Sequence, residues 1–238
     1  MNILLLVGFF ESFLFPRSVL YEREFNPAHL HEKKFELILG SETRYELAEL
    51  RAFYFYSRVD RFSIRFTSFG GSLYRENFFE LGFGFPVGGK FALGFNFAGL
   101  NSWVKDLSNE FTYSVKAGGL YGAERFTMSV WVNNINVPRI SSIDYAPISY
   151  TVRFEYLVRG NLNFNIAACG VETEMPFYKC GCAFAPYDII VINLGVNTKP
   201  IVIEYGLKVN VGNMFVFYSG NRHQQLGLTH NLGLGFRR

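Results

Sequence analysis

The sequence predicts an all-β fold, and within that class a closed antiparallel transmembrane β-barrel of roughly 12 to 14 strands, with about 14 preferred. Three observations carry this prediction. Apolar and polar residues alternate along most of the chain, the polar positions are rich in small residues, and long connections alternate with short ones.

The alternation is clearest between residues 150 and 168. Every even position from 150 to 156 is apolar, and the odd positions between them are polar or charged. After a turn at Arg159 and Gly160, the even positions are again apolar, and asparagine occupies 161, 163 and 165. A period of two places one set on each face of a β-strand. Strands are expected at about 33–40, 50–58, 61–69, 76–86, 89–100, 110–117, 124–133, 146–157, 160–169, 177–185, 188–197, 200–209, 213–219 and 225–236.

Alternation alone does not separate a soluble sandwich from a membrane barrel, because each has one apolar and one polar face. The polar rows here contain Gly, Ala, Ser and Asn beside charged residues, which suits an enclosed interior better than a solvated outer face. So many strands also exceed what one sandwich of 238 residues needs. A secreted, soluble all-β binding module remains the alternative.

The connections favour the barrel. Longer ones are expected at 41–50, 70–76, 101–110 and 133–146, with tight turns between most of them, although 118–124 and 197–199 fit this scheme poorly. Long loops on one rim and tight turns on the other are typical of outer-membrane barrels, with both chain ends on the tight side. The predicted location is therefore the outer membrane of a Gram-negative-type bacterium, with membrane lipid as the first partner.

Two parts are expected along the chain: an N-terminal segment, 1–32, as a periplasmic lead-in, and a single barrel domain, 33–238. The apolar run from Ile3 to Phe10 resembles a weak export signal, although a first buried strand or a short helix would give the same pattern. No run of 18 apolar residues occurs, which excludes a spanning helix on length.

The side chains that could carry chemistry do not assemble into a known motif. A net charge of +3 without a basic run argues against a nucleic-acid partner. No catalytic motif is recognisable, the four histidines do not converge in sequence, and Cys169, Cys180 and Cys182 are expected to remain free thiols. We therefore expect no enzyme, no catalytic residue, no metal and no cofactor.

The strand register assigns side chains to the two faces. The lumen-facing candidates combine both charges with a basic excess, so they would attract anions, such as a fatty-acid carboxylate, or pair with one another: Arg61, Arg65, Glu80, Lys116, Arg125, Arg153, Glu155, Lys179, Glu204 and Lys208. The lipid-facing candidates are apolar: Phe62, Phe126, Val152, Phe154, Phe164, Ile166, Ile203 and Leu232. Trp103, Trp131 and several tyrosines suit an aromatic girdle, with core packing as the alternative.

Residues 78–100 and 130–158 resemble outer-membrane barrels related to the long-chain fatty acid transporter family and to PorV/PorQ-like proteins of the type IX secretion system. The resemblance rests on Asn134, Ile135, Asn136 and Pro138, then Pro147, Tyr150 and Tyr156, and on the final HQQLGLTHNLGLGF, and it covers about two thirds of the chain. The chain is shorter than those proteins usually are, no plug domain is recognisable before the first strand, and Arg237 and Arg238 follow the terminal aromatic residue.

The resemblance implies a barrel of about 14 strands and leaves function open, because a fold does not fix a function. Passive passage or binding of small hydrophobic or amphiphilic molecules is the expected activity. A non-transporting secretion or assembly partner that binds other proteins through its long loops is the alternative.

Overall fold

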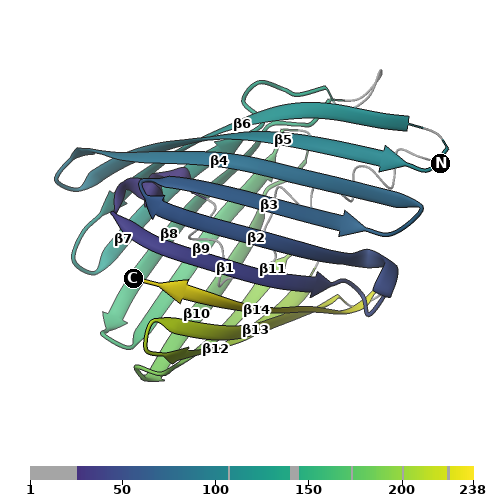
Figure 1. Cartoon of the computed structure of the whole chain (residues 1–238). Helices are drawn as coiled ribbons and strands as arrows, with labels where there is room; N and C mark the ends of the chain where they lie inside the picture. The colour runs from purple at the N-terminus through teal and green to yellow at the C-terminus, as the bar shows by residue number, and fades with distance from the viewer. Residues whose placement is uncertain (1–25, 107, 140–144, 173, 200, 224–225) are drawn as a thin grey trace.

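The computed structural model describes residues 26–238 except 107, 140–144, 173, 200 and 224–225. Fourteen strands form one closed antiparallel barrel, in which sequence neighbours pair and β1 pairs with β14 (Figure 1). The predicted fold class and the preferred strand count are confirmed. Eight residue pairs, from Glu36–Arg237 to Thr43–His230, join the first strand to the last, which excludes two separate stacked sheets. The proposed export signal lies outside the described residues.

The strands run up and down the barrel in chain order: β1 (Lys34–Thr43), β2 (Arg51–Asp60), β3 (Phe62–Gly70), β4 (Tyr74–Gly88), β5 (Phe91–Val104), β6 (Ser108–Gly122), β7 (Phe126–Asn133), β8 (Ser149–Arg159), β9 (Leu162–Val171), β10 (Phe177–Tyr187), β11 (Ile190–Thr198), β12 (Ile201–Val211), β13 (Met214–His223) and β14 (Gly227–Arg237).

Two 3₁₀ turns accompany the strands, η1 (Pro27–His31) before β1 and η2 (Ala48–Leu50) between β1 and β2. Among the described residues, no helix has the length and apolar character needed to cross a membrane, a finding that does not bear on crossing by strands.

Most strands present a more exposed and a more buried row, as a period of two requires. In β5 the exposed row includes Phe91, Phe95 and Phe97, whose exposed fractions are 59%, 40% and 62%, whereas Ala92 and Asn96 between them are buried. Small and polar side chains therefore face the interior, and large apolar side chains form the outer surface.

The two rims of the barrel differ. The strand-connecting turns on one rim, on the left in Figure 1, are each three residues or shorter, and β14 ends there; we call it the turn rim. On the opposite loop rim, the long connections are 44–50 and 134–148.

Two of the long connections expected from the sequence are mostly strand. β4 already begins at Tyr74, β5 continues to Val104, and β6 begins at Ser108, so only three residues separate each pair. The expected connection at 118–124 is likewise wrong, because β6 continues to Gly122. Gly118 pairs with Trp131 on β7 and Gly94 on β5, so the ladder continues where the side chains lose their alternation.

Candidate functional site

The predicted lumen-facing charged residues fall into three groups by burial. Glu80, Arg153, Glu155, Lys179 and Glu204 have exposed fractions of 3–6%. Arg65, Lys116 and Lys208 are slightly more exposed than this group, and the Lys208 Nζ lies 3.9 Å from the centre of the Phe215 ring. Arg61 and Arg125 lie in turns on the turn rim, Arg61 half-buried and Arg125 exposed.

The predicted lipid-facing residues lie in the outer row. Six are exposed by 38–62%: Phe62, Phe154, Phe164, Ile166, Ile203 and Leu232. Phe126 and Val152 are half-buried. The Phe126 ring packs on the Phe154 ring at 5.9 Å between centroids, while Val152 lies between Val130 and Ala168 in the ladder.

One carboxylate organises the polar interior near the middle of β4. Glu80 contacts two cations, the Arg65 guanidinium at 3.1 Å and the Lys116 ammonium at 3.3 Å. All three side chains are at least 87% buried, and Asn96 adds a hydrogen bond to Glu80. The register places these residues on β3, β4, β5 and β6, so the cluster ties four consecutive strands together from inside. Across the barrel, Arg153 and Glu155 form a second buried pair at 3.1 Å.

The segment from Asn26 to His31 lies inside the barrel, where the sequence reading recognised no plug. It packs on the inner faces of β4, β5 and β6, and Ala28 and Leu30 are almost completely buried. The Asn26 Nδ2 donates a hydrogen bond to the Gly119 carbonyl at 3.0 Å, and its Oδ1 accepts one from Ala28 N.

Glycines on the barrel wall make room for this segment. A Cβ atom at Gly94 would lie 2.2 Å from the Pro27 carbonyl carbon, and one at Gly118 would lie 2.0 Å from the Asn26 Oδ1. Gly82 and Gly84 are similarly blocked by Leu30. The close approach at Gly118 explains one of the three glycines that made 118–124 look like a loop.

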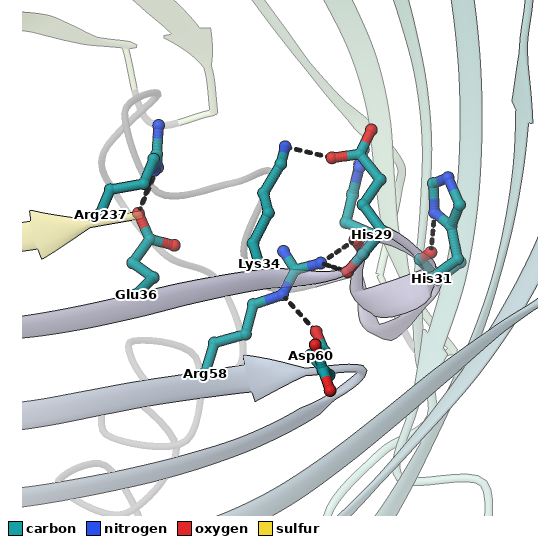
Figure 2. A network of polar contacts seen from close by, with 9 residues as sticks. His29, His31, Lys34, Glu36, Arg58, Asp60 and Arg237 are labelled. Atoms are coloured by element: carbon teal, nitrogen blue, oxygen red, sulfur yellow. Dashed lines mark hydrogen bonds and ion pairs between the residues drawn. The ribbon is translucent and has the colours of Figure 1, made fainter. Parts of the chain in front are cut away.

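Polar contacts hold this segment at the turn rim (Figure 2). Arg58 donates hydrogen bonds to the carbonyl oxygens of His29, Glu32 and Asp60, and Arg237 pairs with Glu36. Burial of Glu32 opposes its ionisation, but the hydrogen bond and charge of Lys34, together with the charges of His31 and Arg58, outweigh burial, so the pKa of Glu32 is lowered.

Two cavities lie inside the barrel. The turn-side cavity has a volume of about 540 Å³ and lies between η1 and the opposite wall, where Ile38, Tyr56, Phe215 and Phe217 form a buried apolar cluster. The loop-side cavity has a volume of about 30 Å³ and lies against the loop-side halves of β4, β5 and β6. Its lining includes Phe78, Ala98, Leu100 and Pro138 together with the Glu80 cluster, so it combines an apolar wall with buried charges.

Residues 134–136 also cover part of a strand edge. β7 pairs with β6 only from Ala117 to Gly122. The loop-side half of β6 therefore lies beyond the last residue pair between these two strands. Asn136 pairs with this edge, because its Oδ1 accepts from Val115 N and its Nδ2 donates to the Tyr113 carbonyl, each at 2.9 Å. The Asn134 Oδ1 accepts a hydrogen bond from the Ser114 hydroxyl.

The sequence reading missed Glu76, Asn96 and Asn133 of the loop-side cavity. Glu76 lies on the same face of β4 as Glu80, four residues earlier, but the strand was expected to start there. Following the period of two back from Glu80 to the first residue of the expected strand, 76–86, would have found it. The two tryptophans expected in an aromatic girdle differ in exposure: Trp131 is buried, whereas Trp103 is 37% exposed. All three cysteines are free, Cys169 buried and Cys180 exposed, as expected.

No protein-family model matches the sequence, and no curated protein matches it. Solved structures do match. The Pseudomonas putida toluene transporter TodX superposes with a TM-score of 0.61 at 9% identity, covering 91% of this chain and 93% of that one. A Pseudomonas aeruginosa FadL homologue gives 0.57 at 9%, covering 90% and 92%, and the Acinetobacter baumannii outer membrane protein Omp33 gives 0.59 at 11%, covering 87% and 99%. At these identities the likeness is one of fold, and the fold is that of outer-membrane barrels with transport proteins among them.

Proposed function

We propose that the protein is an outer-membrane barrel of a Gram-negative-type bacterium that binds small hydrophobic or amphiphilic molecules and allows their passive passage, without a catalytic step. The exposed apolar rows support the membrane location. Monomeric soluble proteins rarely expose continuous apolar surface on this scale, whereas hydrocarbon lipid accepts it. The closed ladder supports it too, because every strand edge within hydrocarbon must be paired.

The observation that carries the functional part is the turn-side cavity of about 540 Å³. Ile38, Phe215 and Phe217 offer an apolar wall to a hydrophobic body, and Arg153 and Asn165 in the same lining offer polar groups. Pockets of about 300 to 1,000 Å³ that combine apolar walls with a few fixed polar groups are typical of small-molecule sites. The solved structures with the same fold include proteins named as toluene transporters and as a monoaromatic hydrocarbon channel, which agrees with this ligand class.

The two cavities support an order of events. A ligand entering from the loop rim would meet the loop-side cavity first. It would then reach the wider turn-side cavity. The segment that contains η1 narrows this cavity from one side, and the Phe215–Phe217 cluster narrows it from the other. Passage therefore requires either movement of the segment or a path beside it.

The experiment measures saturable binding of radiolabelled benzyl alcohol to the full chain in lipid nanodiscs by equilibrium dialysis, with empty nanodiscs subtracted. Ala183→Leu adds bulk to the turn-side cavity and is expected to weaken binding at least tenfold. Ala98→Leu adds the same bulk to the small loop-side cavity and is the matched control, expected to change binding less than threefold. Absence of saturable binding to the wild-type chain would contradict the proposal.

A second candidate is a secretion or assembly partner, as in the PorV/PorQ-like proteins. Exposed apolar side chains at the loop rim favour it: Leu47, Leu73, Ile135, Val137, Met175 and Leu226. If this surface were the functional one, Leu73→Asp with Met175→Asp would impair secretion or assembly while leaving benzyl alcohol binding unchanged. Ligand binding without any such defect would leave the first proposal standing alone.

A further inference from the structure

Two arginines flank a glycine on the outer face of the barrel at the loop rim. Ala52 pairs with Phe69, which places Arg51 beside Gly70, and Gly70 pairs with Arg75. Both arginines are exposed and belong to the outward rows of β2 and β4. Their Cα atoms are two strand spacings apart, about 10 Å, so the two side chains can reach a common point above β3.

The two arginines lack a counter-charge. Neither forms an ion pair or a side-chain hydrogen bond within the part of the chain that the structure describes. Glu49 precedes Arg51 by two residues, but it is exposed on η2 and does not pair with Arg51. Glu76 follows Arg75, but its side chain is buried on the inner face. Two like charges held close together repel one another, and an anion between them would remove this repulsion.

Gly70 keeps the space between the arginines free of a side chain. Its φ is +98°, and a Cβ atom there would lie 2.3 Å from the Tyr74 carbonyl oxygen, so only glycine fits this position. A Cβ atom at the next residue, Gly71, would meet open space. A group that approaches β3 from outside therefore finds a cation on each side and no side chain in the middle.

The neighbouring residues place the arginines at the edge of the apolar outer surface. From the loop rim, the outward row of β4 contains Arg75, Asn77, Phe79 and Leu81, and the last two are 45% and 46% exposed. The Asn77 Nδ2 donates a hydrogen bond to the Asn101 Oδ1 on β5 at 3.5 Å. The outer face thus changes from apolar through neutral polar to cationic within six residues, as a crossing from hydrocarbon to headgroups requires.

Trp103 indicates the same boundary. It pairs with Arg75 and is 37% exposed on the outer face. Tryptophan is enriched where membrane meets water, and arginine side chains near that level extend into the headgroup region. An anionic lipid presents its phosphate group there, within reach of basic side chains.

We propose that Arg51 and Arg75 clamp the phosphate group of an anionic membrane lipid, with Gly70 leaving room for the phosphate and Phe79 in contact with an acyl chain. A guanidinium group holds its donors in a fixed plane that matches phosphate oxygens, and two of them offset a doubly charged phosphate. The apolar surface directly below favours a lipid as the source of this phosphate. The proposal rests on the membrane location in the proposed function and is independent of the turn-side cavity.

The test measures quenching of Trp103 fluorescence by lipids brominated near the headgroup end of the acyl chains. The full chain, with Trp131→Phe so that Trp103 alone reports, is reconstituted in equal mixtures of phosphatidic acid and phosphatidylcholine. Bromine is placed on one lipid or on the other, and the two quenching strengths give the lipid preference. We expect a preference for phosphatidic acid of at least threefold. In Arg51→Gln with Arg75→Gln it should fall below 1.5-fold, with each single variant in between.

Two controls separate a phosphate clamp from general attraction. Arg222→Gln is the matched control, because Arg222 is also exposed in an outward row at the loop rim, but lies on β13 between Ile203 and Leu228. It should leave the preference unchanged. Arg51→Lys with Arg75→Lys keeps both charges without the planar fork and should lower the preference below twofold. An unchanged preference in this lysine variant would overturn the clamp.

The outcomes separate this proposal from the proposed function. Equal quenching of the wild-type reporter by the two brominated lipids overturns the phosphate site and leaves the membrane location intact. Absence of quenching by either lipid overturns both. Loss of the preference in about 20 mM inorganic phosphate, compared with sodium chloride at the same ionic strength, would assign the arginines to free phosphate and overturn the lipid site.

Discussion

Glu80 illustrates how a single inward-facing residue can organise the barrel interior. Its carboxylate contacts two cations from neighbouring strands, and all three groups are largely withdrawn from water. Removing one member of a buried set of charges is more damaging than replacing the whole set, because the remaining charges stay buried without compensation. Outward-facing residues lie in different surroundings, which favour apolar side chains and disfavour charged ones.

Glu80→Gln tests the inward role. The change keeps the side-chain shape but leaves Arg65 and Lys116 facing each other without a carboxylate, so the free energy of unfolding should fall by about 3 to 5 kcal/mol. Urea-induced unfolding in lipid vesicles, followed by tryptophan fluorescence, measures this loss. Glu124→Gln at the exposed turn before β7 is the control and should be nearly neutral. A loss below about 1 kcal/mol for Glu80→Gln would contradict a structural role for the cluster.

Ile166→Arg tests the outward role. Ile166 lies at the centre of β9 and is 53% exposed on the outer face, so an arginine there would be placed in hydrocarbon. The expected cost is about 2 to 4 kcal/mol in the same unfolding assay, falling to about 0 to 1 kcal/mol for Ile189→Arg in a turn at the rim. Equal costs at the two positions would argue against an apolar environment around β9.

At the scale of elements, β4, β5 and β6 form the specialised part of the wall. They contain 15, 14 and 15 residues, more than any other strand, and they carry the glycines against which η1 packs. Their loop-side halves line the cavity that contains Glu76. The same three strands therefore hold the internal segment at one end and line the small loop-side cavity at the other.

Gly94→Val tests the seat of the internal segment. A Cβ at Gly94 would overlap the Pro27 backbone, so residues 26–31 should leave the wall and widen the lumen. Swelling of reconstituted liposomes in isosmotic solutions of small sugars should become faster than with the wild-type chain. Gly88→Val, on the same hairpin but with open space around its Cβ position, should leave swelling unchanged. Wild-type permeability in Gly94→Val would show that the segment does not obstruct the lumen.

The elements that the sequence predicts well are those defined by local alternation. The expected pattern is followed closely by β8, β9, β12 and β14, because the polarity of each side chain there indicates which face of the strand it occupies. The ends of β4, β5 and β6 were missed because Gly, Asn and Ser interrupt the alternation there while backbone pairing continues. The position of η1 and the approach of Arg51 to Arg75 around Gly70 depend on residues from several strands, so no local pattern could reveal them.

At the scale of the whole molecule, two properties define the barrel: the closure of the strand ladder and the orientation of the side chains toward its two faces. Closure is completed by β1 and β14, where Arg237 donates to Glu36 on the inside and the Phe35 and Phe236 rings meet outside at 5.9 Å. Orientation places the apolar rows outward around the barrel, and the polar rows around the two cavities. Neither property depends on the identity of the ligand.

Quenching of tryptophan fluorescence by brominated lipid tests that orientation most directly. Single tryptophans are introduced as Phe164→Trp and Asn165→Trp in a chain whose Trp103 and Trp131 are replaced by Phe, and each is reconstituted in vesicles with bromine on the acyl chains. Phe164 is 48% exposed on the outer face, whereas Asn165 is 8% exposed on the inner face. The account predicts strong quenching at position 164 and little at position 165. Equal quenching at both positions, or quenching at 165 alone, would contradict it.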